Sequence, residues 1–126
     1  MNKATELLKE AKTFFIATVE GDQPRVRPFG AVAEIDGKTY LSLNNTKEVF
    51  KQLMANPKAE ICAMIGGKWF RMHGTLVRDD RNEARAEFLK QCPLPMYTAD
   101  DGKFEIFYFS EVSGSVESFG GPKETF

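Results

Sequence analysis

Three glycine-containing turns punctuate a chain of short β-rich segments, and they constrain the fold more than any other feature. Gly21-Asp22, Asp36-Gly37 and Gly66-Gly67 each separate two segments rich in β-branched and aromatic residues. Two-residue turns of this kind join antiparallel strands, because their backbone twist matches the twist of the strands. The sequence therefore predicts a mainly β domain built from antiparallel hairpins.

Three helices are expected beside these strands. Apolar residues at helical spacing predict a helix over residues 2–12. Patterns that resemble polar N-terminal caps predict two more, one starting at Asn45–Glu48 and ended by Asn56-Pro57, the other running from Asp80 to about Leu89. The strands are expected at residues 13–19, 25–35, 39–43, 59–65, 68–78, 104–112 and 115–119. This order predicts one α+β domain over residues 1–126, an antiparallel barrel with peripheral helices.

Composition narrows the classes of function. The chain carries 17 basic and 18 acidic residues, a formal net charge of −1, whereas nucleic-acid binders usually carry a basic excess. Cys62 and Cys92 are far apart, so we expect buried free thiols and neither a disulfide nor a metal site. No apolar run approaches the roughly 20 residues that span a bilayer. We therefore expect a cytoplasmic protein that binds neither nucleic acid nor membrane.

The start of the second helix is a candidate anion site. Asn44, Asn45, Thr46 and Lys47 stand where a strand meets a helix, and the first N–H groups of a helix attract phosphate. Lys47 adds a charge and Thr46 a hydroxyl. The alternative interpretation is an ordinary helix cap with a solvated Lys47.

The second strand has an unusual pattern for a core strand. Alternation places Arg25, Arg27 and Phe29 on one face, and a guanidinium matches phosphate geometry. Pro28 lacks an N–H, which indicates an edge or a bulge, and Gly30 allows a ring to approach the backbone. The alternative is a solvated face with two solubilising arginines.

The fifth strand places Trp69, Arg71, His73 and Thr75 on one face. A flat ligand stacked near Trp69 is one interpretation, and an exposed strand face is the other. His73 is the only histidine and is expected to be structural. The chain has neither a phosphate-binding glycine loop nor a nucleophile elbow, so we predict no catalytic side chain and assign any reactivity to a bound organic cofactor.

In this order the segments resemble the pyridoxamine 5′-phosphate oxidase-like family of flavin-binding split barrels, in the branch near the nitroimidazole-resistance proteins. The matching segments are residues 14–19, 21–29, 37–42, 51–57 and 69–71 with Gly74. The resemblance implies a six- to seven-stranded antiparallel split β-barrel with three peripheral helices. It also implies FMN at a homodimer interface, with the phosphate near Arg27, Ser42 and Lys47. The expected cofactor contacts are Arg27, Pro28, Phe29, Gly30, Ser42, Asn44, Thr46, Lys47 and Trp69.

The chain also departs from the vitamin-processing oxidases of that family. Its tail, Ser118–Pro122, lacks the Trp, Arg and His that hold their substrate, and Val32 stands where they carry a basic residue. We therefore expect an FMN-dependent oxidoreductase of unknown substrate, with a small-molecule electron donor and acceptor. The alternatives are a non-catalytic flavin-binding protein for storage or sensing, a deazaflavin in place of FMN, and a ligand-free interaction module.

The sixth strand bears on the oligomeric state. From Ile106 onward the segment Phe104–Phe109 is apolar on both faces, so its outer face must be covered. A helix or a second subunit can cover it, and the resemblance favours the subunit. A homodimer with two-fold symmetry is the expectation.

Overall fold

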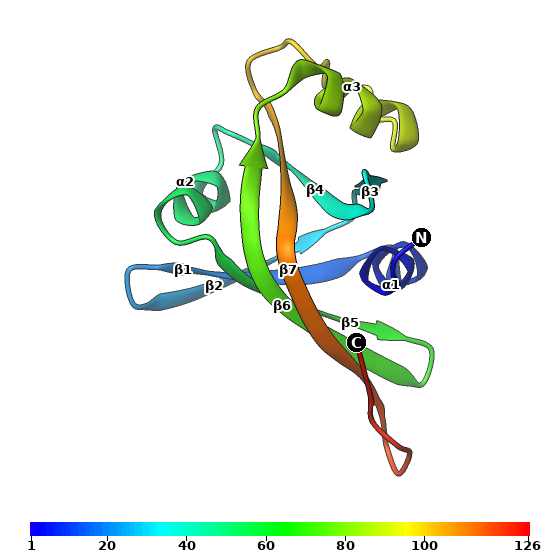
Figure 1. Cartoon of the computed structure of the whole chain (residues 1–126). Coiled ribbons are helices and arrows are strands. Elements are labelled where there is room, and N and C mark those ends of the chain that lie inside the picture. Colours follow the sequence, from blue (N-terminus) through cyan, green and yellow to red (C-terminus); the bar gives the residue numbers. More distant parts are fainter.

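The computed structural model of the chain describes residues 1–126, which form eight strands and three helices (Figure 1). In chain order the elements are α1 (Lys3–Ala11), β1 (Phe14–Glu20), β2 (Gln23–Phe29), β3 (Val32–Ile35), β4 (Lys38–Asn44), α2 (Glu48–Ala55), β5 (Lys58–Ile65), β6 (Lys68–Asp79), α3 (Asn82–Gln91), β7 (Phe104–Ser118) and β8 (Glu124–Thr125). The three predicted helices and the antiparallel β fold are confirmed.

One antiparallel sheet contains all the strands, in the order β2-β1-β5-β6-β7-β4-β3, with β8 on β7. The edge strands β2 and β3 do not pair with each other, so the sheet is open, as a split barrel requires. The expected single strand over residues 25–35 is therefore wrong. It divides at Gly30-Ala31, and its halves pair at opposite edges, β2 with β1 and β3 with β4. Proline at position 28 and the end of the β1 pairing at Phe29 mark the break.

The expected sixth and seventh strands are one strand. β7 pairs with β6 along its length, and the two cross the centre of the molecule side by side (Figure 1). The register shifts between Thr75 and Leu76, which leaves Ser110 as the extra residue of a bulge. Gly114 does not break the strand but permits the pairing, because a Cβ there would collide with the Arg71 carbonyl and the Phe126 ring. The short strand β8 was not anticipated from the sequence.

The two faces of β7 belong to two different hydrophobic clusters. Phe107 and Phe109 join the main core of 19 buried residues inside the curled sheet. Phe104 and Ile106 point the other way, into a cluster with Phe88 of α3. The outer face of this strand segment is thus covered by the chain's own helix, and the inference that a second subunit covers it is wrong.

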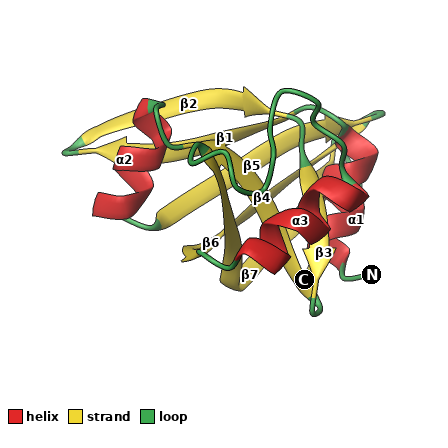
Figure 2. Ribbon diagram, turned by 90° about the horizontal axis from the view of Figure 1, so that it is seen from above, coloured by secondary structure: helices red, strands yellow, loops and turns green.

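The helices occupy different parts of the sheet. In both views α2 lies on one side of the molecule, while α1 and α3 lie on the other (Figures 1 and 2). Helix α2 packs on β1 and β4, burying Val49 and Leu53 in the main core. The start of α2 is thereby held at one end of the barrel.

Candidate functional site

The turn that leads into α2 brings together three of the predicted phosphate contacts. Asn44 Oδ1 accepts hydrogen bonds from the Thr46 backbone N at 2.9 Å and from Thr46 Oγ1 at 2.7 Å. Lys47 is the exposed N-cap, and no side chain caps the helix, so the expected polar cap at Asn45 is wrong. The first N–H groups of α2 therefore have no side-chain partner, and the helix dipole favours an anion there.

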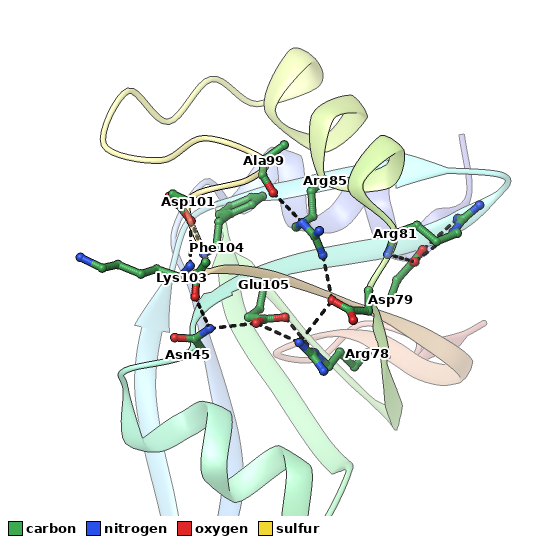
Figure 3. A network of polar contacts seen from close by, with 12 residues as sticks. Asn45, Arg78, Asp79, Arg81, Arg85, Ala99, Asp101, Lys103, Phe104 and Glu105 are labelled. Carbon is green, nitrogen blue, oxygen red and sulfur yellow. Dashed lines mark hydrogen bonds and ion pairs between the residues drawn. The ribbon is translucent and has the colours of Figure 1, made fainter.

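Asn45 is used elsewhere, in the polar network of Figure 3. Its Nδ2 donates to the carbonyl of Gly102 at 2.8 Å and to Oε2 of Glu105 at 2.9 Å. Buried Glu105 also accepts from Nε of Arg78 at 2.8 Å and from its Nη2 at 3.1 Å. The hydrogen bond to Glu105 is the main cause that raises the pKa of Arg78. The loop before α2 is thus tied to β6 and β7.

Only the C-terminal half of β2 alternates between half-buried and exposed residues. Arg27 lies opposite Ile16 and Phe29 opposite Phe14, on the core side of the sheet, and the Phe29 and Phe14 ring centroids are 6.4 Å apart. Arg27 and Phe29 are both half-buried, so the interpretation of a solvated face is wrong for Arg27. Pro28 is exposed on the outer side, and exposed Gly30 stands between β2 and β3.

Arg25, the other arginine on this face, is exposed and pairs with Glu20, with 2.9 Å between its Nη2 and the carboxylate oxygen. Arg27 instead reaches under α2, where it donates to Gln52. It is therefore joined to the second turn of α2.

Ser42 lies on the other face of the sheet. Its neighbours Leu41 and Leu43 enter the main core, so half-buried Ser42 points to the side that Asn44 shares and α3 covers. Ser42 is thus close to the turn before α2, whereas Arg27 is on the opposite face. Ser42, Asn44, Thr46 and Lys47 thus lie at the end of β4 and the start of α2, whereas Arg27 contacts Gln52 in the second turn of α2.

Trp69 is remote from the turn before α2. It is the second residue of β6, whereas Arg78, which contacts the loop before α2 through Glu105, stands near the other end of that strand. At the rise of a β-strand the two residues are roughly 30 Å apart. Trp69 packs on Phe119, with ring centroids 4.8 Å apart, and Phe119 is 87% exposed. Sequence reasoning did not single out Phe119, because its contact with Trp69 depends on the register of β6 and β7.

The outer face of β1, β2 and β5 carries exposed apolar side chains that no element of the chain covers, whereas Arg71 and His73 make the adjoining face of β6 polar. Val26 is 68% exposed and Met64 60% exposed, and Phe15 is exposed between them on β1. A groove of about 680 Å³ crosses the same face, and most of the residues that line it are polar, with Lys58, Glu60 and Glu111 beside Ala17 and Gly74. Sequence reasoning missed this groove, because its walls come from strands whose alignment no short motif reveals.

His73 lies in that groove between Glu60 of β5 and Ser113 of β7. Its Nε2 is 3.3 Å from Ser113 Oγ. The expectation of buried thiols is wrong for Cys62, which is exposed on this face, whereas Cys92 is half-buried.

No group of three or more His, Cys, Asp or Glu side chains lies close enough to hold a metal ion. None of the three helices is long and apolar enough to cross a membrane.

The chain is similar to solved structures of two bacterial proteins. Among solved structures, a NimC/NimA family protein from Clostridium acetobutylicum is 49% identical, with a TM-score of 0.95 over 98% of this chain and 89% of that one. A pyridoxamine 5′-phosphate oxidase-related, FMN-binding protein from Nostoc punctiforme shares the fold at 18% identity, with a TM-score of 0.71 over 97% of this chain and 85% of that one. No curated protein sequence matches the chain.

The family model for pyridoxamine 5′-phosphate oxidase matches residues 1–109, which include every strand and helix up to the first half of β7. The matched segment therefore contains the turn before α2, strand β2 and Trp69. This chain belongs to the pyridoxamine 5′-phosphate oxidase family.

Proposed function

We propose that the chain is an FMN-dependent oxidoreductase that binds its flavin at the interface of a homodimer. The observation that carries the proposal is the uncapped start of α2 beside Lys47, on a turn fixed by the Asn45–Glu105–Arg78 network. The FMN-binding relative from Nostoc punctiforme, which shares the fold, supports the choice of ligand.

The residues around this turn fit a phosphomonoester. The N–H groups of the first turn of α2 lack a side-chain cap, Thr46 contributes a hydroxyl and exposed Lys47 contributes a positive charge. Ser42 and Asn44 stand immediately before them on β4. Exposed Gly30, between β2 and β3, leaves backbone that a flat ring can approach.

Trp69 is the reason for proposing a shared site. Within one chain, Trp69 lies roughly 30 Å along β6 from Arg78, too far to touch a flavin whose phosphate is at Lys47. The uncovered apolar face of β1, β2 and β5 adjoins Trp69 through the pairing of Met64 with Trp69. A second copy packed on this face would bring its own Trp69 towards the first copy's flavin. The proposed dimer therefore completes the site.

Bound flavin would supply hydride transfer, which no side chain of this chain can perform. The protein's own part is to bind the phosphate, to hold the ring against β2 and to exclude water by dimerisation. No side chain is assigned as an acid or a base. The substrate is a small molecule that fits beside the ring.

Titration of the apo-protein with FMN, riboflavin and FAD tests the ligand. FMN should bind most tightly, and Lys47→Ala should weaken FMN by about 1–3 kcal/mol, the range for one charge-assisted contact, while riboflavin affinity stays unchanged. Lys51→Ala is the matched control, since Lys51 is also exposed on α2 but lies one turn further along. Equal affinity for riboflavin and FMN would contradict the phosphate site.

A redox assay tests the enzymatic half of the proposal. Anaerobic NADH or NADPH should bleach the flavin absorbance, and an added electron acceptor should restore it. A protein that holds FMN but shows neither change is a flavin store or sensor and not an oxidoreductase. If a deazaflavin binds more tightly than FMN and displaces it, the deazaflavin is the cofactor instead.

A further inference from the structure

We propose that Arg27 is a positioning residue, which holds α2 against β1 and β2 through Gln52 and Thr18, and that it is not itself a phosphate ligand. The proposal rests on the FMN site proposed above. It assigns phosphate binding to the start of α2 and explains how that start is kept in place.

Arg27 is bonded to three neighbours. Its Nη1 donates to the carbonyl of Ile16 at 3.1 Å and to Thr18 Oγ1 at 2.8 Å. Its Nη2 donates to Gln52 Oε1 at 2.7 Å. Thr18 Oγ1 in turn donates to the same Gln52 oxygen at 2.6 Å, which closes a ring of three hydrogen bonds. This ring joins strands β1 and β2 to helix α2.

The ring is built into the protein interior. Thr18 is 1% exposed and Gln52 is 5% exposed, so each polar atom would be costly to leave unpaired. Gln52 is the only polar side chain of α2 that is buried. A buried amide that accepts two hydrogen bonds from two strands fixes both the distance and the rotation of the helix.

The charges around Arg27 are consistent with this role. Glu20, the nearest acidic partner of the network, is bonded to Arg25 at 2.9 Å and accepts from Gln52 Nε2 at 3.4 Å, and no carboxylate bonds to Arg27. Burial is the main cause that lowers the pKa of Arg27, followed by the charge of Arg25. Arg27 therefore acts through neutral acceptors, in directed contacts that a lysine cannot reproduce.

Position along the helix separates Arg27 from the phosphate. Gln52 stands five residues after the N-cap Lys47, which is roughly 7 Å along the helix axis. The free N–H groups of the first turn, those of Glu48 and Val49, lie three to four residues before Gln52. Both Nη atoms of Arg27 already donate to Ile16, Thr18 and Gln52, and the bond to Gln52 holds the guanidinium at the second turn of α2.

A double-mutant cycle with Arg27→Met and Gln52→Met tests the proposal. The readout is the ratio of FMN affinity to riboflavin affinity in the folded apo-protein, which a general loss of stability does not change. Each single variant should lower the ratio by about tenfold, and the double variant should be no worse than either, because both remove the same link. Arg27→Lys should lose as much as Arg27→Met, and Thr18→Ser should retain the wild-type ratio. Arg25→Met, which removes the same charge from the same strand, is the control.

The other outcomes contradict the proposal. A phosphate-binding Arg27 predicts that Arg27→Lys keeps most of the preference for FMN, that Gln52→Met has no effect, and that the losses are additive. An unchanged ratio in Arg27→Met also overturns the positioning role. If the methionine variants do not fold, Arg27→Lys and Thr18→Val replace them in the same cycle. A wild-type protein without preference for FMN would instead overturn the proposed function, which distinguishes the two failures.

Discussion

Two parts of the sheet carry apolar side chains on their outer face, and only one of them is covered. Beside α3, the outward residues Phe104 and Ile106 of β7 are buried against Phe88. Across β1, β2 and β5, the outward residues Phe15 and Val26 remain exposed. The difference lies in the placement of the helices, because α1 and α2 pack on the core side of β5 and β1 and no helix covers the outer face of these strands.

The outer face of β7 is buried when the chain folds, whereas the outer face of β1, β2 and β5 is still exposed in the folded chain. An apolar outer face favours burial, but it does not identify the element that would cover it. On β7 it is α3, which turns a surface into a second core. On β1, β2 and β5 a second copy is the proposed cover, and Trp69, on the same side of the sheet, is the residue that this copy would contribute to the proposed flavin site.

Removing the cover of the first region should have the largest effect. Phe88→Ala deletes a fully buried ring that packs on Phe104 at 5.7 Å between centroids, and should destabilise the chain by about 3–5 kcal/mol. Urea unfolding followed by far-ultraviolet circular dichroism measures the loss. Phe119→Ala is the matched control, since that ring is exposed and its removal should cost less than about 0.5 kcal/mol. Similar losses in both variants would contradict the assignment of α3 as a core element.

The stability contributed by Asp79, at the end of β6 next to α3, should depend on pH. The Arg81 side chain is the main cause that lowers the pKa of Asp79 from 3.8 to about 2, and the Tyr40 hydroxyl also donates to it at 2.7 Å. Because the folded pKa is depressed, this contribution is fully present above pH 4 and is lost as the pH falls towards 2.

The difference in unfolding free energy between wild type and Asp79→Asn should therefore shrink by about 2 kcal/mol between pH 6 and pH 2. Urea unfolding at a series of pH values measures it, and comparison with the variant cancels the other carboxylates that titrate in this range. A difference that stays constant with pH would show that the contacts with Arg81 and Tyr40 do not lower the pKa of Asp79 in the folded protein.

The smallest effect on folding is expected at the uncovered region. Phe15→Asp should change the unfolding free energy of the monomer by less than about 0.5 kcal/mol, because the side chain is exposed. It should nevertheless dissociate the dimer, since a charge replaces an aromatic contact at the centre of the proposed interface. Sedimentation equilibrium at low micromolar concentration measures the dimer. A Phe15→Asp protein that stays dimeric would place the interface elsewhere.

Much of the fold was predictable because local chemistry encodes it. The turns at Asp36-Gly37 and Gly66-Gly67, and the alternation of Phe70 and Met72 with Trp69 and Arg71, appear in the structure as the sequence indicates. The division of the second strand at Gly30 was not predictable, because pairing at two distant edges is a property of the whole sheet. The continuity of β7 was missed for the same reason, since Gly114 in sequence resembles a break.

The site was predictable in its parts and not in its arrangement. Residue types located the turn at Thr46–Lys47, which the structure places at the start of α2. The partners of Arg27 were not foreseen, because Thr18 and Gln52 meet it only after β1, β2 and α2 have packed. Capping by Asn45 was a reasonable local prediction, but its Nδ2 donates to Glu105, 60 residues away, and to Gly102, and the helix starts two residues later, after Lys47.

Complementation between two defective variants tests the shared flavin site most directly. Lys47→Ala and Trp69→Ala proteins, each impaired in FMN binding, are mixed, dissociated in mild denaturant and refolded together. In a mixed dimer one of the two sites combines an intact Lys47 with an intact Trp69 from the other copy. If the flavin site is shared, the mixture regains FMN binding of wild-type affinity at a fraction of the sites, whereas each variant alone does not. A mixture that binds FMN no better than the separate variants would contradict a site built from two chains.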